Sequence, residues 1–354
     1  MNRLLSMEGQ VRGRYLGRGK LRDDRGSQFF PLALSDSGTD TEAGRIGLYP
    51  KMRSSIIDTI IVPAQATIDS DSNVTTSLES YVGDMIDELS SIDRADFRLK
   101  RDIIDTFASR WLMKAMLKMD ADDTTVKLLK SLFRGDFEHN YVASIMEPLA
   151  SEFVSEERAK NIQIEFDKLR ALIESSPLLQ ASSFQFVESM NITKDDYTEV
   201  VGELIGIAGI TGLGLFLENM LRNIPDQALE TINPDDSVEL EAAVLELARL
   251  NTAVRNVNII LSEETALHVG GETKLFPKGT PVASNLPLAN WNENIFSDPF
   301  VFNHTRHNLF EDTVSFATRG YDPNSMPRRS CPGKALAMKA GRDVLAAWIK
   351  KHKQ

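Results

Sequence analysis

The stretch Pro327-Arg-Arg-Ser-Cys-Pro-Gly-Lys-Ala-Leu-Ala-Met338 contains Cys331, the only cysteine in a chain of 354 residues. Beyond it, apolar residues recur every three or four positions, which predicts an amphipathic helix from about residue 332 to about residue 350. The inner face of this helix is formed by Leu336, Ala340, Val344 and Trp348. Free backbone N–H groups and the helix dipole favour a thiolate at such an N-terminus, and a thiolate binds iron. The alternative is an ordinary small buried cysteine.

The pattern Arg-x-Cys-x-Gly followed by a helix resembles the heme-binding loop of the cytochrome P-450 family. The resemblance implies that Cys331 is the axial ligand of the iron of a heme b. It also implies that Arg329 binds a heme propionate and that Gly333 lets the backbone approach the sulfur. The loop between Phe316 and Cys331 is longer than the family's usual Phe-x-x-Gly-x-Arg-x-Cys. An elongated loop is also a feature of the plant hydroperoxide-metabolising branch of the family.

A second motif lies in the helix predicted for residues 237–250. Glu246-Leu-Ala-Arg249 places an acid and a base one turn apart on one face, which by itself is also typical of a solvated ion pair. The motif resembles the family's Glu-x-x-Arg helix, and residues 282–306 resemble the family's stretch from the small sheet into the meander. The resemblance implies that Arg306 completes a buried network with Glu246 and Arg249, which holds the proximal side against the heme.

Further heme contacts follow from the resemblance alone. Tyr49-Pro-Lys-Met-Arg53 opens a predicted helix where the family commonly has Trp or His four residues before an arginine. This implies that Arg53 binds a propionate and that Tyr49 belongs to the same site. A solvated arginine near a helix start is the alternative for Arg53. Arg255 is expected to replace a propionate-binding arginine that the family carries a few residues later.

The longest apolar helix is predicted for residues 198–224 and is rich in glycine. Each glycine weakens a helix by roughly 1 kcal/mol relative to alanine, so the space it leaves must serve either close helix packing or a flat macrocycle. In the resemblance this is the distal helix, where oxygen-activating members carry Ala/Gly-Gly-x-Asp/Glu-Thr. Ala208, Gly209, Thr211 and Gly212 occupy the matching places, and the usual acid and threonine are absent. Because that pair supplies protons, the sequence disfavours ordinary monooxygenation.

The composition narrows the range of partners. With 51 acidic and 40 basic side chains the formal charge is -11, which disfavours a nucleic acid and favours a small apolar substrate. One cysteine excludes an intramolecular disulfide, and the first residues lack the apolar core of a signal peptide, so we expect a cytoplasmic protein. The longest uncharged apolar run, from Leu204 to Leu217, is shorter than the roughly 20 residues of a membrane-spanning helix. No membrane span is expected.

The periodicities also indicate the fold class. Apolar residues recur at helical spacing from Pro50 onward, whereas residues 255–285 alternate and contain turn signals. We therefore predict a mainly α-helical chain with a small β-sheet (α+β). The resemblance implies one cytochrome P-450-like heme domain over residues 1–354, with the cysteine loop and proximal helix at 316–350. Residues 1–48 are predicted to be irregular and are fewer than the family normally has there, so the fold is expected to be N-terminally abbreviated.

Three functions remain open. The first is a heme-thiolate oxidoreductase that uses a peroxide or rearranges its substrate without a reductase, as hydroperoxide lyases and allene oxide synthases do. The second is a reductase-dependent monooxygenase, for which the basic residues of 328–353 offer a docking face to an acidic ferredoxin-type carrier. The alternative for that segment is a solvated helix. The third is a non-catalytic heme-binding protein. The five histidines lack metal-binding spacing, which disfavours a metal hydrolase.

Overall fold

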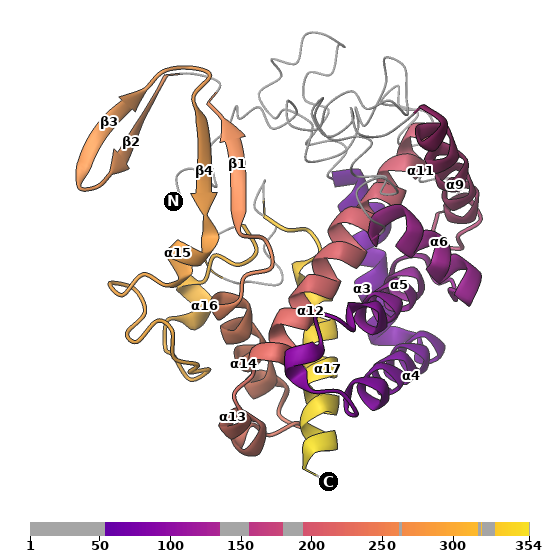
Figure 1. Ribbon diagram of the computed structural model, residues 1–354, viewed down its shortest axis with the longest axis horizontal. Coiled ribbons are helices and arrows are strands. Elements are labelled where there is room, and N and C mark those ends of the chain that lie inside the picture. The colour runs from indigo at the N-terminus through magenta and orange to yellow at the C-terminus, as the bar shows by residue number, and fades with distance from the viewer. Residues whose placement is uncertain are drawn as a thin grey trace.

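The chain forms a helical body that carries its β-strands on one side (Figure 1). This computed structural model describes residues 54–134, 156–179, 194–261, 264–317, 320 and 330–353. Helices α3 to α11 gather at one end of the molecule, and the strands lie at the other (Figure 1). The predicted fold class, mainly α-helical with a small amount of antiparallel β-structure, is confirmed.

The helices follow the apolar periodicity of the sequence, and several are capped by side chains. In chain order they are η2 (Ile57–Ile61), α3 (Val62–Ser70), α4 (Ser72–Leu89), η3 (Arg94–Asp96), α5 (Arg101–Leu117), α6 (Asp123–Arg134), α9 (Glu156–Glu174), α11 (Lys194–Glu203), η4 (Leu204–Thr211), α12 (Gly212–Asn223), α13 (Asp226–Thr231), α14 (Ser237–Leu250), α15 (Leu286–Asn290), α16 (Leu309–Asp312) and α17 (Lys334–His352). Asp71 before α4 and Asp236 before α14 accept hydrogen bonds from backbone N–H groups of the first turn. Local sequence thus fixes where these two helices begin.

One long helix, here called the central helix, runs through the body and consists of α11, η4 and α12. The predicted helix at 198–224 corresponds to this element, but the structure adds a feature that the sequence pattern did not reveal. Its middle part, η4, is π-helical, and the Thr211 hydroxyl donates to the carbonyl of Gly206, five residues earlier, at 3.2 Å. Short π-helical segments within α-helices are frequent at functional sites.

The central helix is also the most apolar helix among the described residues. Residues Val200–Asn223 are long and apolar enough to cross a membrane by length and composition. However, 67% of the most apolar window is buried inside the fold, where α5, α6, α14 and α17 pack against the central helix. Such burial is typical of a core helix, so this criterion is weak evidence for a membrane span.

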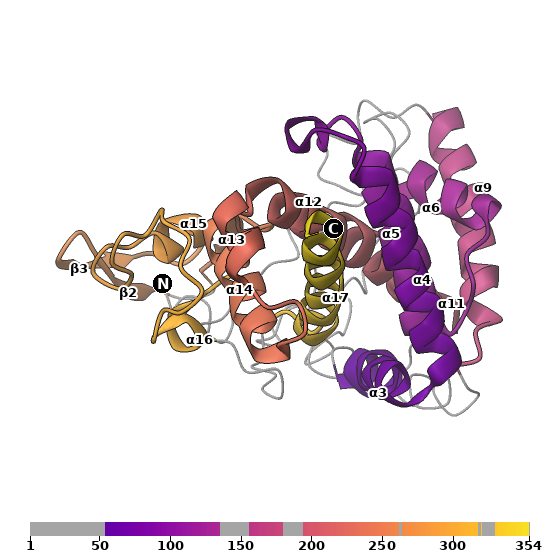
Figure 2. The same cartoon turned by 90° about the horizontal axis from the view of Figure 1, so that it is seen from below.

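Helix α17 lies between α14 on one side and α4 and α5 on the other (Figure 2). Its predicted inner face is buried: Leu336, Ala340, Val344 and Trp348 are each at most 4% exposed. Gly341 permits the close approach of two neighbours. A Cβ atom there would lie 2.8 Å from a methyl carbon of Val244 in α14 and 3.0 Å from the ring of Phe216 in α12. The proximal helix is therefore held firmly against the central helix.

Among the described residues, the small β-structure predicted for 255–285 consists of two antiparallel strand pairs. Strand β1 (Asn256–Ile260) pairs with β4 (Pro281–Asn285), and between them β2 (Thr265–Val269) pairs with β3 (Glu272–Phe276). The β2–β3 hairpin projects from the body (Figure 1), and most of its side chains are exposed.

Candidate functional site

Cys331 lies three residues before the first residue of α17, at the helix end that the sequence predicted. Its backbone N–H donates to the carbonyl of Phe316 at 3.0 Å, so both ends of the cysteine loop are joined. The side chain is partly exposed and forms no disulfide. Gly333, two residues on, would place a Cβ atom 4.0 Å from the sulfur, which is an ordinary contact. The fold thus presents the thiol at the amino end of a long helix.

Glu246, Arg249 and Arg306 come together in one buried network. The Arg249 guanidinium donates to both carboxylate oxygens of Glu246, at 2.6 and 2.8 Å. Nε of Arg306 donates to Oε1 of Glu246 at 3.0 Å. The side chains of Glu246 and Arg249 are 0% exposed and that of Arg306 is 5% exposed. Paired charges of opposite sign and bidentate geometry make burial of the carboxylate tolerable.

Asn290 connects this network to the cysteine loop, and the sequence analysis did not single it out as a site residue. Its carbonyl accepts from Nη1 of Arg249 at 2.6 Å, and its side-chain oxygen accepts from the backbone N–H of Val314 at 2.9 Å. Its amide donates to the Ser315 hydroxyl at 3.1 Å. Phe316, whose carbonyl binds the Cys331 N–H, is the next residue. The buried ion pairs therefore fix the segment on which the cysteine depends.

The central helix keeps one open stripe, although most of the helix is buried. Ala208 is exposed, and Thr211, Gly212 and Leu215 are half-buried, at intervals of three and four residues. A Cβ atom at Gly212 would meet no atom within 4 Å. The ring of Phe216 contacts that of Phe316, with centroids 6.5 Å apart. The stripe therefore belongs to a helix that directly adjoins the cysteine loop.

Of the other glycines in the central helix, two serve helix packing, which is one of the two roles that the sequence left open. A Cβ atom at Gly206 would lie 2.2 Å from the Phe133 ring of α6, and one at Gly209 would lie 2.9 Å from Leu112 of α5. Only glycine, which has no Cβ atom, admits such close neighbours. Gly209 therefore does not share the open space at Gly212, although the two are three residues apart.

The packing role of Gly206 gives a testable expectation. Replacing it in Gly206→Ala forces the Phe133 ring to move, and overpacking typically costs about 1–3 kcal/mol. The gain in helix propensity, about 1 kcal/mol, offsets only part of this. We expect a lower free energy of unfolding in urea. Gly83→Ala in α4, where a Cβ atom meets nothing within 4 Å, is the matched control and should be neutral or stabilising. Equal stability of both variants would contradict the packing role.

The sequence and the fold of this chain both have known counterparts. Residues 238–352, which run from α14 through α15 and α16 to α17, match the family model described as Cytochrome P450. No curated protein matches the sequence. Among solved structures, that of CalO2 covers 99% of this chain at a TM-score of 0.66 and 16% identity, and the match covers 80% of CalO2.

This chain has the cytochrome P450 fold. Two further structures agree. The P450 TxtC, described as carrying out thaxtomin hydroxylation, has a TM-score of 0.59 and 17% identity, with 97% of this chain and 82% of TxtC covered. P450BioI, in complex with an acyl carrier protein ligated to hexadec-9Z-enoic acid, has a TM-score of 0.58 and 14% identity, with 96% and 80% covered. The resemblance drawn from the sequence is therefore confirmed for the fold, and over residues 238–352 the family model agrees with it.

The residues present fit the prosthetic group that this P450 fold implies. A heme-thiolate centre requires a thiolate donor, a flat space beside it and a helix that leaves that space open. Cys331 supplies an accessible sulfur, and Gly212 leaves room on the central helix. Three predicted heme contacts, Tyr49, Arg53 and Arg329, lie outside the described residues. Arg255, at the residue before β1, is described and exposed.

The basic residues that follow Cys331 are largely neutralised by acids of the same helix and of other segments. Four ion pairs account for this: Lys339 with Asp343, Arg342 with Glu241, Lys350 with Asp235, and Lys351 with Asp87. Lys334 is only 1% exposed, and Lys353 donates to the Ile232 carbonyl. Burial raises the pKa of Asp343, and the neighbouring Lys339 opposes this shift. The segment therefore presents much less unpaired positive charge than its sequence suggested.

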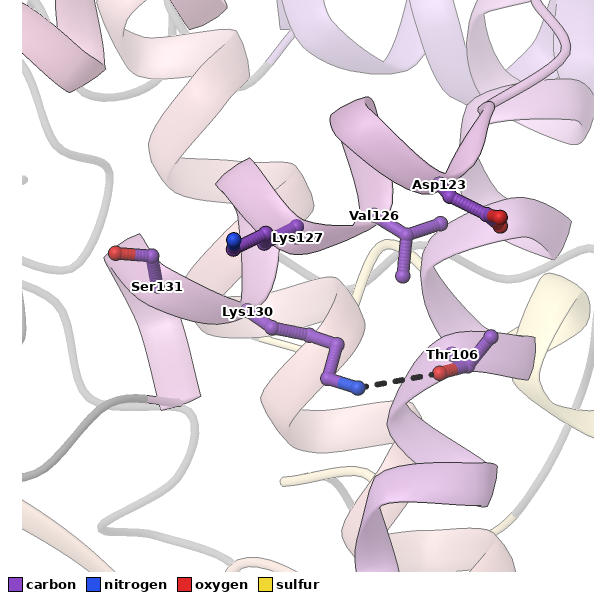
Figure 3. Close-up of a pocket in the computed structure, with 6 residues that line it drawn as sticks. All are labelled: Thr106, Asp123, Val126, Lys127, Lys130 and Ser131. Carbon is purple, nitrogen blue, oxygen red and sulfur yellow. Dashed lines mark hydrogen bonds between the residues drawn. The ribbon is translucent and has the colours of Figure 1, made fainter.

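A crevice on the outer side of the helical body contains none of the predicted site residues. It lies between α5 and α6, has a volume of about 400 Å³, and is lined by Thr106, Asp123, Val126, Lys127, Lys130 and Ser131 (Figure 3). Lys130 donates to the Thr106 hydroxyl across it. Its cations and hydroxyls come from two exposed helix faces, so it is a surface depression and does not compete with the Cys331 region as the active site.

Proposed function

We propose that this chain is a heme-thiolate oxidoreductase that acts on a small, largely apolar organic substrate in the cytoplasm. The observation that carries the proposal is the position of Cys331 at the start of α17, joined to Phe316 and backed by the Glu246 network. In this proposal Cys331 would hold the iron of a heme b. Arg53, Arg255 and Arg329 would bind its propionates, since arginine suits carboxylate groups, and Tyr49 would belong to the same site.

When bound, the heme supplies the oxidative chemistry, and the protein supplies orientation and electrostatics. The open stripe of the central helix presents a methyl group, a glycine and a leucine, at Ala208, Gly212 and Leu215. The Thr211 hydroxyl donates to the Gly206 carbonyl within the helix. This stripe therefore offers no carboxyl group to deliver a proton. An oxidant that already contains an O–O bond needs less proton delivery, so we place peroxide-type or rearrangement chemistry first.

A reductase-dependent monooxygenase is the second candidate. The hydroxylation ascribed to TxtC, a structure of the same fold, favours it, and water can replace a side chain in proton delivery. A ferredoxin-type carrier would then be the partner. The pairing of Lys339, Arg342, Lys350 and Lys351 with acids leaves little free charge to attract it, which is why this candidate stands second. A non-catalytic heme-binding protein is the third candidate.

One double variant separates the first two candidates. Thr211→Asp with Gly212→Thr restores an acid and a hydroxyl at the family's places. For a peroxide-dependent enzyme, we expect turnover of the native substrate to stay unchanged or fall, because the new side chains fill the space beside Gly212. For a monooxygenase, the coupling of NADPH consumption to product should rise, by about 10-fold or more for a positioned acid.

The unmodified enzyme provides the reference for this experiment. Each candidate oxidant is supplied separately: hydrogen peroxide, a lipid hydroperoxide, or NADPH with ferredoxin and its reductase. Product formed with a peroxide alone supports the first candidate. Steady NADPH-dependent product together with inactivity towards every peroxide would reverse the order. Inactivity with all three oxidants, in protein that binds heme, would favour the non-catalytic protein.

A further inference from the structure

A buried charged cluster packs against the central helix, beside the edge of the open stripe that Thr211 forms. Arg101, at the start of α5, donates to Asp105 of the same helix at 3.1 Å and to Glu218 of α12 at 2.6 Å. The side chain of Arg101 is 13% exposed, and those of Asp105 and Glu218 are each 5% exposed. Arg134 and Arg222 bind the same two acids from the partly exposed rim. Each buried acid thus has two cationic partners.

Arg101 also touches the backbone of the central helix at a particular place. Its Nη2 donates to the carbonyl of Thr211 at 3.3 Å. Thr211 is the last residue of the π-helical part, and Gly212 is the first residue of α12. In a π-helix each backbone N–H pairs with the carbonyl five residues earlier, whereas in an α-helix it pairs with the carbonyl four residues earlier. A hydrogen bond from another helix to a carbonyl at the junction can therefore fix where one pairing changes to the other. The guanidinium thus reaches the junction from outside the helix.

Gly214 provides a separate observation that the cluster needs this position. A Cβ atom there would lie 2.8 Å from Oδ1 of Asp105 and 3.0 Å from Nη2 of Arg101. Gly214 follows Gly212 by two residues, which is about 200° around an α-helix, so the two glycines lie on opposite sides. One glycine admits the charged cluster, and the other leaves the open space on the stripe.

We propose that Arg101, held by Asp105 and Glu218, is a positioning residue that fixes the Thr211–Gly212 junction and thereby the open stripe. This inference rests on the proposed function, because only in that function would the stripe face a heme. It assigns a role to charges that the sequence left unexplained. The two acids act through Arg101 and the backbone, and they do not contact the substrate.

The test uses Arg101→Lys, which keeps the positive charge but loses the planar fork that reaches two acids and a carbonyl together. Two readouts apply to the full-length protein. Amide hydrogen exchange in residues 204–215 should accelerate by roughly 10-fold, because the junction opens more often. In the ferrous carbon monoxide complex, the C–O stretching band should broaden or split, since the stripe no longer has one position. Heme content should stay at the wild-type level.

Arg110→Lys is the matched control, because Arg110 lies on the same helix and pairs with the exposed Asp123 without contacting the central helix. It should change neither readout. Gly214→Ala is the second variant and keeps every charge while displacing the cluster. It should reproduce the broadened band, whereas Gly83→Ala should not.

Unchanged exchange and an unchanged C–O band in folded Arg101→Lys would overturn the inference and leave the proposed function intact. Loss of folding in both Arg101→Lys and Gly214→Ala would assign the cluster to global stability and also overturn it. If the wild-type protein takes up no heme, the proposed function fails. The exchange rates of residues 204–215 then still decide whether Arg101 fixes the junction.

Discussion

Cys331→Ser is expected to abolish the long-wavelength absorption band that thiolate ligation gives to the ferrous carbon monoxide complex of the heme. The substitution changes one atom and should leave the fold intact. Because Cys331 is the only cysteine, no other thiolate can take its place. Serine is a far weaker ligand, since its hydroxyl holds its proton at neutral pH. The measurement is the difference spectrum of the reduced protein with and without carbon monoxide.

Circular dichroism and a heme assay complete this experiment. The variant should keep the helical content of the wild-type protein, because α17 is held by Leu336, Ala340, Val344 and Trp348 and not by the thiol. Cys331→His offers a nitrogen ligand instead and should also lose the band. A folded Cys331→Ser protein that retains the wild-type spectrum would show that another residue binds the iron.

The cysteine loop illustrates what the sequence can predict. The helix that follows Cys331 has a regular apolar period, so its existence and its buried face could be inferred from spacing alone. Glu246 and Arg249 are likewise separated by three residues, which places them on one face of any helix. In both cases the information lies within one or two helical turns. Arg306 joined them only through the family resemblance.

Long-range contacts could not be inferred in the same way. The basic residues after Cys331 looked like one charged face because their partners, Asp87, Asp235 and Glu241, are far away in the sequence. For Gly206 and Gly209 the sequence left helix packing and a macrocycle both open, since no pattern tells which helix crosses the central helix. Packing between distant segments decided both cases.

The central helix shows the same limit at the level of the backbone. Its apolar run predicted a single helix, yet residues 204–211 are π-helical and Arg101 contacts the end of that part. The pair Arg101 and Asp105 has the i,i+4 spacing of a common surface ion pair, so nothing in its sequence distinguishes it. Only the approach of Gly214 and Glu218 shows that it is buried. That residues 1–354 form a single domain stays a prediction.

Glu246→Ala is expected to have the largest effect on stability. The change removes the acceptor for Arg249 and Arg306 and leaves the 0% exposed Arg249 with an uncompensated charge. Breaking a buried pair in this way costs about 3–5 kcal/mol, a large fraction of the usual stability of a domain. The backbone N–H of Asn303 also loses its acceptor, Oε1 of Glu246. We expect insoluble protein, or protein that is purified without heme.

The matched control is Glu241→Ala on the same helix. Glu241 pairs with Arg342 at 2.9 Å, but both side chains are more than a fifth exposed, so its removal should cost about 0–1 kcal/mol. Glu246→Gln provides an intermediate, since the amide keeps the shape and one oxygen acceptor while it loses the charge. Heme content and melting temperature are measured for all three variants. Because Asn290 transmits the position of Arg249 to Val314 and the cysteine loop, heme loading should fall in the order Glu241→Ala, Glu246→Gln, Glu246→Ala. Wild-type heme loading and melting temperature in Glu246→Ala would show that the network does not support the cysteine loop.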